Sequence, residues 1–132
     1  MGRAKRAPTP ADFARWVRKL GRMVVALVTS NYPPKRGKAT WASALILARW
    51  TSDSDSPWML VKLRGKLSGE EPFSLQITDE MSGVLKRLWG MRSATGPEPW
   101  WGLQVTVAPH DKPALQLDPD PNCAVDPMWF KS

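Results

Sequence analysis

The sequence predicts an α+β domain, a five-stranded antiparallel sheet with two helices packed on one face, in the order α-β-β-β-α-β-β. Two stretches place apolar residues at three- and four-residue spacing, which is typical of amphipathic helices. Five shorter stretches lie between turn-forming residues and have the composition of strands. Helices do not alternate regularly with these strands, so a parallel doubly wound sheet is not expected.

The first helix is predicted to begin near Thr9, a residue that caps helices well. Pro10 suits the first helical position, and Asp12 places a negative charge at the positive end of the helix dipole. The helix must end before Pro33 and Pro34, which cannot continue it. The predicted buried stripe is Phe13, Trp16, Val17, Leu20, Val24, Leu27 and Val28, and the opposite face carries Arg15, Arg18, Lys19 and Arg22.

The five strands are predicted at residues 40–50, 58–67, 72–77, 100–109 and 113–118. The first is apolar on both faces, as expected of a central strand. The second alternates, which predicts Met59, Val61 and Leu63 on one face and Leu60, Lys62 and Arg64 on the other. The segment 33–38 is predicted as a loop, and 51–57 as a polar connection.

The second helix is predicted to begin at Thr78 or Asp79 and to bury Met81, Val84, Leu85, Leu88 and Trp89. A length of 132 residues fits a single domain, which we place at residues 9–121. Residues 1–8 are predicted to be a disordered basic tail. Residues 122–132 are predicted to be an irregular, acidic and proline-rich segment.

One cysteine excludes an internal disulfide and a cysteine-built zinc site. No apolar run reaches the roughly 18 residues that a membrane span requires, and the N-terminus lacks the apolar block of a secretory signal. We therefore expect a cytoplasmic protein with no membrane partner.

Charge and tryptophan content indicate macromolecular binding. The net charge is +7, but residues 1–50 carry eleven Lys and Arg against one acidic residue, whereas the remainder carries eight against eleven. Such asymmetry bears on partners rather than on fold. A domain of this size is not expected to bury all eight tryptophans, so some should lie at an interface.

Catalytic residues are scarce. His110 lies in a predicted turn, and Cys123 has no partner nearby in the sequence, so neither fits a nucleophile–base pair. No glycine-rich phosphate-binding motif is present. Asp118 and Asp120 end a predicted strand, but two carboxylates are too few for a dedicated cation site. The sequence therefore predicts no enzyme, no metal and no cofactor.

Nucleic-acid binding is the alternative. Basic residues of the tail, the first helix and the following loop could line a phosphate track, with Trp16 and Trp41 stacking on bases. No helix-turn-helix, RNA-recognition or zinc-finger signature supports this function. The basic residues are Arg3, Lys5, Arg6, Arg15, Arg18, Lys19, Arg22, Lys35, Arg36 and Lys38.

The element order and several local patterns resemble the YezG-like immunity proteins of bacterial polymorphic toxin systems. The patterns are Trp41 opening the first strand, the segment VLKRLWGMR at 84–92, Gly96 four residues before Trp100, and the ending LDPDP at 117–121. Two positions depart from the family. Leu117 replaces an expected tyrosine, and no glycine lies in the turn at 109–112. The overall basic charge also differs from that expected of an inhibitor of a nucleic-acid-processing toxin.

The resemblance implies that the protein binds a cognate protein toxin and occludes its active site. Under this hypothesis Trp100 and Trp101, adjacent on a strand and pointing to opposite faces, are candidate anchors. Glu98, Asp118 and Asp120 are candidate contacts to a basic cleft, and the basic helix face would suit an acidic one. Phosphate-dominated binding would weaken steeply with salt, which separates this hypothesis from nucleic-acid binding.

Overall fold

The computed structural model describes residues 7–51 and 58–125. Helix α1 (Pro10–Asn31) begins with a capping box. The Thr9 hydroxyl accepts a hydrogen bond from the Asp12 N–H at 3.2 Å, and the Asp12 carboxylate accepts one from the Thr9 N–H at 3.0 Å. The helix stops before Pro33 and Pro34. Both predicted ends of this helix are confirmed.

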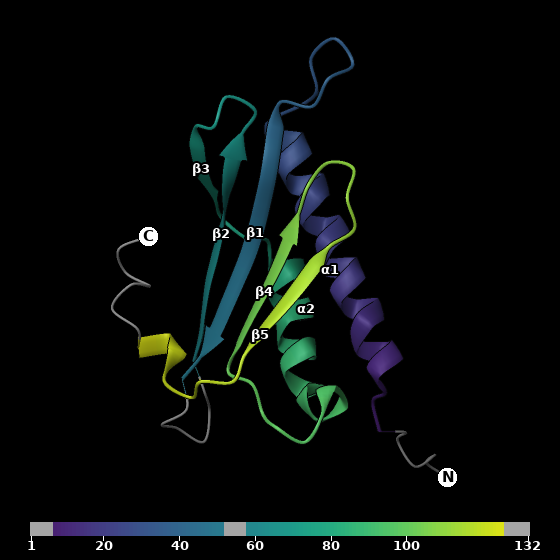
Figure 1. Ribbon diagram of the computed structural model, residues 1–132, viewed down its shortest axis with the longest axis vertical. Coiled ribbons are helices and arrows are strands. Elements are labelled where there is room, and N and C mark those ends of the chain that lie inside the picture. The colour runs from purple at the N-terminus through teal and green to yellow at the C-terminus, as the bar shows by residue number, and fades with distance from the viewer. Residues whose placement is uncertain (1–6, 52–57, 126–132) are drawn as a thin grey trace.

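The strands form one antiparallel sheet in the spatial order β3-β2-β1-β4-β5 (Figure 1). They are β1 (Trp41–Trp50), β2 (Met59–Leu67), β3 (Pro72–Leu75), β4 (Gly102–Val107) and β5 (Ala114–Asp118). Strand β1 pairs with β2 on one side and with β4 on the other. The predicted fold class is confirmed, including the central position of the first strand.

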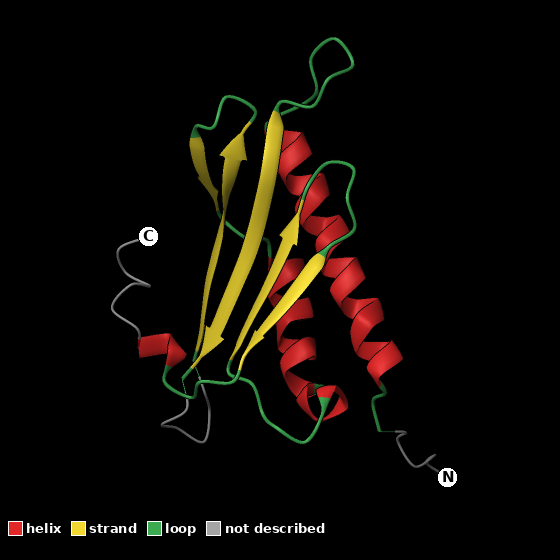
Figure 2. Cartoon of the chain, in the orientation of Figure 1, coloured by secondary structure: helices red, strands yellow, loops and turns green. Residues whose placement is uncertain are grey.

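Helix α2 (Asp79–Gly90) is capped by Thr78, whose hydroxyl accepts a hydrogen bond from the Met81 N–H at 3.2 Å. Helix α1 contacts β1, β4 and α2. The two helices thus form one layer on one face of the sheet (Figure 2). The core lies between the helices and the sheet, and its most deeply buried residues include Leu20, Val24, Val28, Ile46, Leu85, Leu88, Leu103 and Val105.

Tryptophans fill one end of this core. Trp50 stacks on Trp89 with ring centroids 4.7 Å apart, and Trp100 meets both rings edge-on. Trp41, like Trp50 and Trp100, is 2% exposed, whereas Trp58 is 74% exposed. The prediction that the domain does not bury all its tryptophans is confirmed by Trp58, whereas their place at an interface stays a prediction. The eighth, Trp129, lies outside the described residues.

Several boundaries differ from the prediction. Strand β4 begins at Gly102 rather than at residue 100 because Trp100 turns into the core. Strand β3 ends two residues early, at Leu75. Two 3₁₀ helices occur within the described residues, η1 (Arg92–Thr95) and η2 (Cys123–Val125). The second is a correction, since it lies within the segment 122–132 that was expected to be irregular.

Other predicted segments are described only in part. Residues 1–6, 52–57 and 126–132 lie outside the described structure, and so do most of the predicted basic tail and of the polar connection. The loop predicted at 33–38 contains a two-residue hairpin, in which Lys35 and Lys38 exchange two backbone hydrogen bonds of 2.9 Å. Neither described helix is long and apolar enough to cross a membrane.

Candidate functional site

The face of the sheet that points away from the helices is the main surface the described chain leaves open. We call this surface the open face. Strands β1 and β2 supply six of its side chains, which lie opposite one another in pairs. The pairs are Leu45 with Arg64, Leu47 with Lys62, and Arg49 with Leu60. All six side chains are half-buried.

In each pair an aliphatic side chain on one strand therefore lies opposite a cationic side chain on the other. On β2, Lys62, Arg64 and the exposed Lys66 follow one another at every second residue. Alternate strand residues lie about 6.6 to 6.8 Å apart, so these cations form a row along the strand. No strand residue on this face is aromatic, because Trp41, Trp50 and Phe73 are buried in the core. The face is cationic and aliphatic but offers no ring for base stacking.

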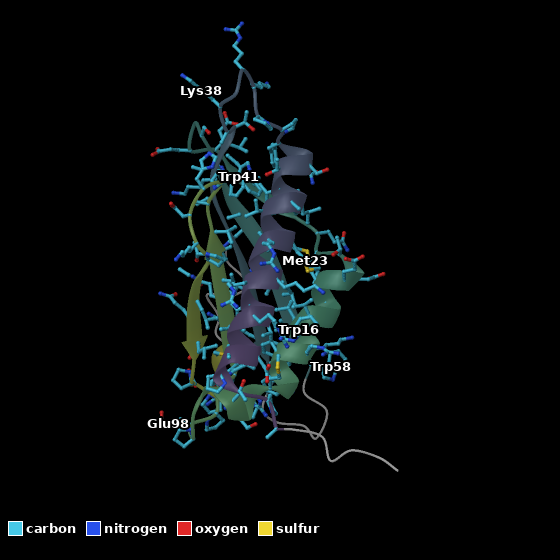
Figure 3. The ribbon with its side chains drawn as sticks, turned by 90° about the vertical axis from the view of Figure 1, so that its right-hand side faces the viewer. Trp16, Met23, Lys38, Trp41, Trp58 and Glu98 are labelled. Atoms are coloured by element: carbon cyan, nitrogen blue, oxygen red, sulfur yellow. The ribbon has the colours of Figure 1, made fainter. Side chains whose placement is uncertain are left out.

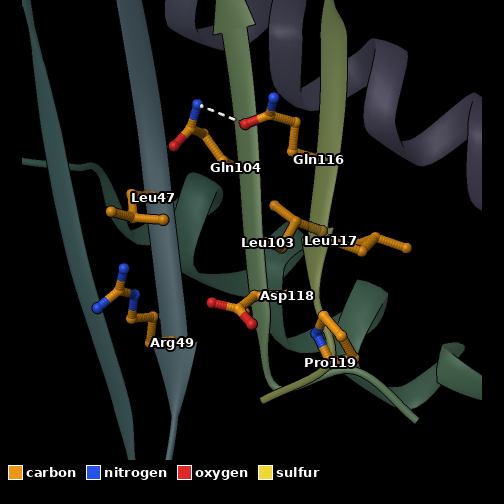
Figure 4. Close-up of a pocket in the computed structure, with 9 residues that line it drawn as sticks. Leu47, Arg49, Leu103, Gln104, Gln116, Leu117, Asp118 and Pro119 are labelled. Carbon is orange, nitrogen blue, oxygen red and sulfur yellow. Dashed lines mark hydrogen bonds between the residues drawn. The ribbon is translucent and has the colours of Figure 1, made fainter. Parts of the chain in front are cut away.

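Strands β4 and β5 continue the open face with neutral side chains and one carboxylate, that of Asp118 (Figure 4). Gln104 lies opposite Gln116, and its amide donates a hydrogen bond of 3.2 Å to the Gln116 carbonyl oxygen. A shallow pocket of about 430 Å³ lies beside this pair. Leu47 and Arg49 line it from β1, and Asp118 lines it from the end of β5.

Helix η2 closes the Arg49 end of the open face. The Arg49 guanidinium donates a hydrogen bond of 2.8 Å to the Cys123 carbonyl. Gly102, opposite Arg49 on β4, allows this close approach, since a Cβ at that position would lie 3.3 Å from the Cys123 Sγ and 3.0 Å from the Asp118 Cβ. The open face thus has a fixed boundary at this end.

Asp118 and Asp120 form consecutive turns that lead into η2. The Asp118 carboxylate accepts a hydrogen bond from the Asp120 N–H, and the Asp120 carboxylate accepts one from the Asn122 N–H, both at 2.9 Å. The two carboxylates therefore stabilise the local backbone, a role that the sequence alone did not reveal for this pair. The role of both residues as partner contacts remains a prediction.

The three other predicted contact residues differ in their exposure. Trp100 is buried, and its Nε1 donates a hydrogen bond of 3.0 Å to the Thr95 hydroxyl, so it stabilises the core rather than offering a partner surface. Trp101 precedes β4 and is half-buried beside Trp89. Glu98 is exposed in the loop before it, at the end of the molecule opposite Lys38 (Figure 3). The Trp101 N–H donates a hydrogen bond of 2.7 Å to the Asp118 carbonyl, so the loop that carries Glu98 leads to the same end of the sheet as Asp118.

The two tryptophans predicted to stack on bases, Trp16 and Trp41, both pack against other residues of the chain. Trp41 is buried in the core. The Trp16 ring has the Lys19 ammonium 4.8 Å and the Arg87 guanidinium 4.5 Å from its centroid. These intramolecular cation–π contacts use the ring that a base would need. The basic row of α1 is exposed as predicted, whereas the basic tail residues Arg3, Lys5 and Arg6 lie outside the described residues.

Reactive side chains are poorly placed for catalysis within the described chain. His110 is exposed in the turn between β4 and β5. Burial, with the nearby Asp118 carboxylate, raises the pKa of the Cys123 thiol to about 11, which disfavours the nucleophilic thiolate at neutral pH. No group of three metal-ligating side chains occurs among the described residues.

Sequence reasoning placed Leu60, Lys62 and Arg64 on one strand face but did not identify that face as a site. Leu45 and Leu47 of β1, which lie opposite these residues, were attributed to a central strand that is apolar on both faces. One signal was available, because helices on one side only leave the other side of a sheet uncovered. No family model and no curated protein matches the chain, so the resemblance to the YezG-like immunity proteins remains a prediction.

Proposed function

We propose that the protein binds a cognate protein toxin and neutralises it, with the open face as the contact surface. The observation that carries this proposal is the cross-strand pairing of aliphatic with cationic side chains on a sheet face that the helices do not cover. The pairs are Leu45 with Arg64, Leu47 with Lys62, and Leu60 with Arg49. Aliphatic side chains supply apolar area to an interface, and arginine is enriched at the centre of interfaces.

The charge of the open face favours an acidic partner. Among its described strand residues, Arg49, Lys62, Arg64 and Lys66 are cationic, and Asp118 alone is acidic. Complementary charge speeds association and selects the partner. The structure thus supports contact with an acidic surface better than contact of Glu98, Asp118 and Asp120 with a basic cleft.

A protein partner fits this face better than a nucleic acid does. Proteins that bind single-stranded nucleic acid through a sheet stack bases on aromatic side chains. The open-face strand residues include no aromatic side chain, and the described tryptophans other than Trp58 pack within the core or against its edge. Half-buried leucines between cations suit a mixed protein interface instead.

Growth rescue tests the proposal. A candidate toxin domain from a neighbouring gene is expressed in bacteria with the wild-type protein, with Arg64→Glu, or with Lys86→Glu as a matched control on the exposed side of α2. We expect the wild type and the control to restore growth. Arg64→Glu should weaken binding about tenfold or more, because it sets like charges against each other.

Calorimetric titration of the purified toxin domain with each variant measures the same effect directly. Circular dichroism of each variant checks that the fold is retained. The proposal fails if the wild-type protein neither binds nor rescues. It also fails if Arg64→Glu binds as the wild type does, since the open face would then not be the contact surface.

A further inference from the structure

The hairpin between α1 and β1 projects from one end of the molecule (Figure 1). Its two central residues, Arg36 and Gly37, have φ angles of 53° and 76°. Positive φ at both positions, closed by the Lys35–Lys38 backbone pair, gives the type I′ turn of a two-residue hairpin. A two-residue turn is the narrowest tip that a hairpin can form.

Arg36 is an unfavourable residue for this position. Type I′ turns prefer Asn, Asp or Gly at the first central position, because the left-handed conformation strains other side chains. Such strained backbone is concentrated at functional sites. Arginine at this position therefore costs the turn some stability, which points to a role of the Arg36 side chain in binding rather than in folding.

Backbone and side-chain hydrogen bonds fix the base of the hairpin. The Thr40 hydroxyl contacts the carbonyl oxygens of Tyr32 and Pro33 at 2.9 and 3.1 Å. The Ser68 N–H donates to the Thr40 carbonyl at 2.9 Å, and the Ser68 hydroxyl donates to the Ala39 carbonyl at 3.1 Å. The tip is therefore preorganised, which lowers the entropy lost when it binds a partner.

The tip carries unneutralised positive charge. Lys35, Arg36 and Lys38 are exposed, and none forms an ion pair with another described residue. The N–H groups of Arg36 and Gly37 make no hydrogen bond within the described chain and remain available to an acceptor. The cationic row of β2 runs toward this same end of the sheet, where the Ser68 N–H hydrogen bonds to the Thr40 carbonyl at the base of the hairpin. A partner that covers the open face and extends past Lys66 would therefore reach the hairpin.

We propose that the hairpin Lys35–Lys38 enters the active-site cleft of the toxin and that carboxylates line this cleft. This inference rests on the proposed function and adds the element that performs the occlusion. A narrow, rigid and convex tip fits a concave site, and its three cations and two free N–H groups match carboxylate oxygens. The open face would supply affinity, and the hairpin would block the substrate.

A neutral hairpin variant, Lys35→Thr/Arg36→Asn/Lys38→Thr, separates these two contributions. It removes three charges and places the favoured Asn-Gly pair in the turn, so its melting temperature should equal or exceed that of the wild type. The comparison variants are Arg64→Glu on the open face and Lys86→Gln on α2. Each is titrated against the toxin domain, with both the dissociation constant and the residual toxin activity at saturation measured.

The two surfaces should give different signatures. We expect the neutral hairpin variant to bind about tenfold more weakly and to leave measurable toxin activity even when the toxin is saturated. Arg64→Glu should bind more weakly but inhibit fully once saturation is reached, and Lys86→Gln should match the wild type. Complete inhibition by the saturated neutral hairpin variant would overturn the inference while leaving the proposed function intact.

Two other outcomes also overturn it. If the wild-type protein binds no toxin, the proposed function fails and the inference fails with it. A duplex DNA of about 20 base pairs, titrated at about 0.15 M ionic strength, tests the competing use of the cations. If the neutral hairpin variant loses DNA binding but inhibits the toxin like the wild type, the hairpin is a nucleic-acid contact.

Discussion

The Arg92 guanidinium lies 3.4 Å from the ring centroid of Trp89 and 5.0 Å from that of Trp101. The same side chain donates a hydrogen bond of 3.2 Å to the Trp100 carbonyl. Arg92 thus joins the end of α2 to the segment that leads into β4. One cation holds together three tryptophans that the sequence separates by up to twelve positions.

Arg92→Ala should lower the free energy of unfolding by about 1 to 3 kcal/mol, since it removes two cation–π contacts and a charge-assisted hydrogen bond. Urea unfolding followed by circular dichroism measures the loss. Lys86→Ala, an exposed cation on α2, is the control and should change stability little. Equal stability of the two variants would show that the Arg92 contacts do not stabilise the fold.

Gly65→Ala should lower the free energy of unfolding by about 2 kcal/mol or more, because the added methyl group has no room between β1 and the Phe73 ring. A Cβ at Gly65 would collide with the Ser43 carbonyl oxygen and with the Phe73 ring. Gly83→Ala is the matched control, since a Cβ at Gly83 meets nothing within 4 Å. On the exposed side of α2 that substitution should stabilise the helix by about 0.5 to 1 kcal/mol.

Arg36→Gly should raise the free energy of unfolding by a few tenths to about 1 kcal/mol, because glycine adopts the left-handed conformation without steric strain. The flexibility that glycine adds to the unfolded chain offsets part of this gain. Gly37→Ala, at φ 76°, should have the opposite sign. Thermal unfolding measures the change in stability of each variant. A loss of stability in Arg36→Gly would show that the Arg36 side chain stabilises the fold by packing.

Cys123 should resist alkylation in the folded protein. Burial raises the pKa of its thiol to about 11, above the roughly 8.5 of an unfolded cysteine. The unfolded chain therefore loses this proton first, so the stability contributed by the thiol is complete below about pH 8.5 and is lost as the pH rises toward 11. Iodoacetamide labelling at neutral pH, with and without denaturant, measures the exposure, and rapid labelling of the folded protein would contradict this assignment.

Comparison with Cys123→Ala isolates the thiol from other groups that titrate at high pH. The wild type should lose more stability than this variant between about pH 8.5 and 11. Urea midpoints across this range measure the difference. Parallel curves for the two proteins would show that the thiol has the same pKa in the folded and unfolded chains.

The elements themselves were predictable because their signals are local. Thr9, Asp12 and Thr78 cap the two helices through contacts within three residues, and Pro33 ends the first helix by its own geometry. Alternation along β2 assigned each side chain to a face without reference to other strands. The local pattern wrongly placed Trp100 in a strand, because its neighbours are apolar and have strand composition. In the structure Trp100 precedes the strand and is buried in the core.

The sequence by itself determined the order of helices and strands, the caps, and the split of charge between the two halves of the chain, because these depend on residues near one another. Only the tertiary structure decided which sheet face stays uncovered. It also set Arg64 beside Leu45 and placed a strained Arg36 at a projecting tip. The reason is physical: register and layer packing depend on long-range pairing, which residues distant in sequence specify together.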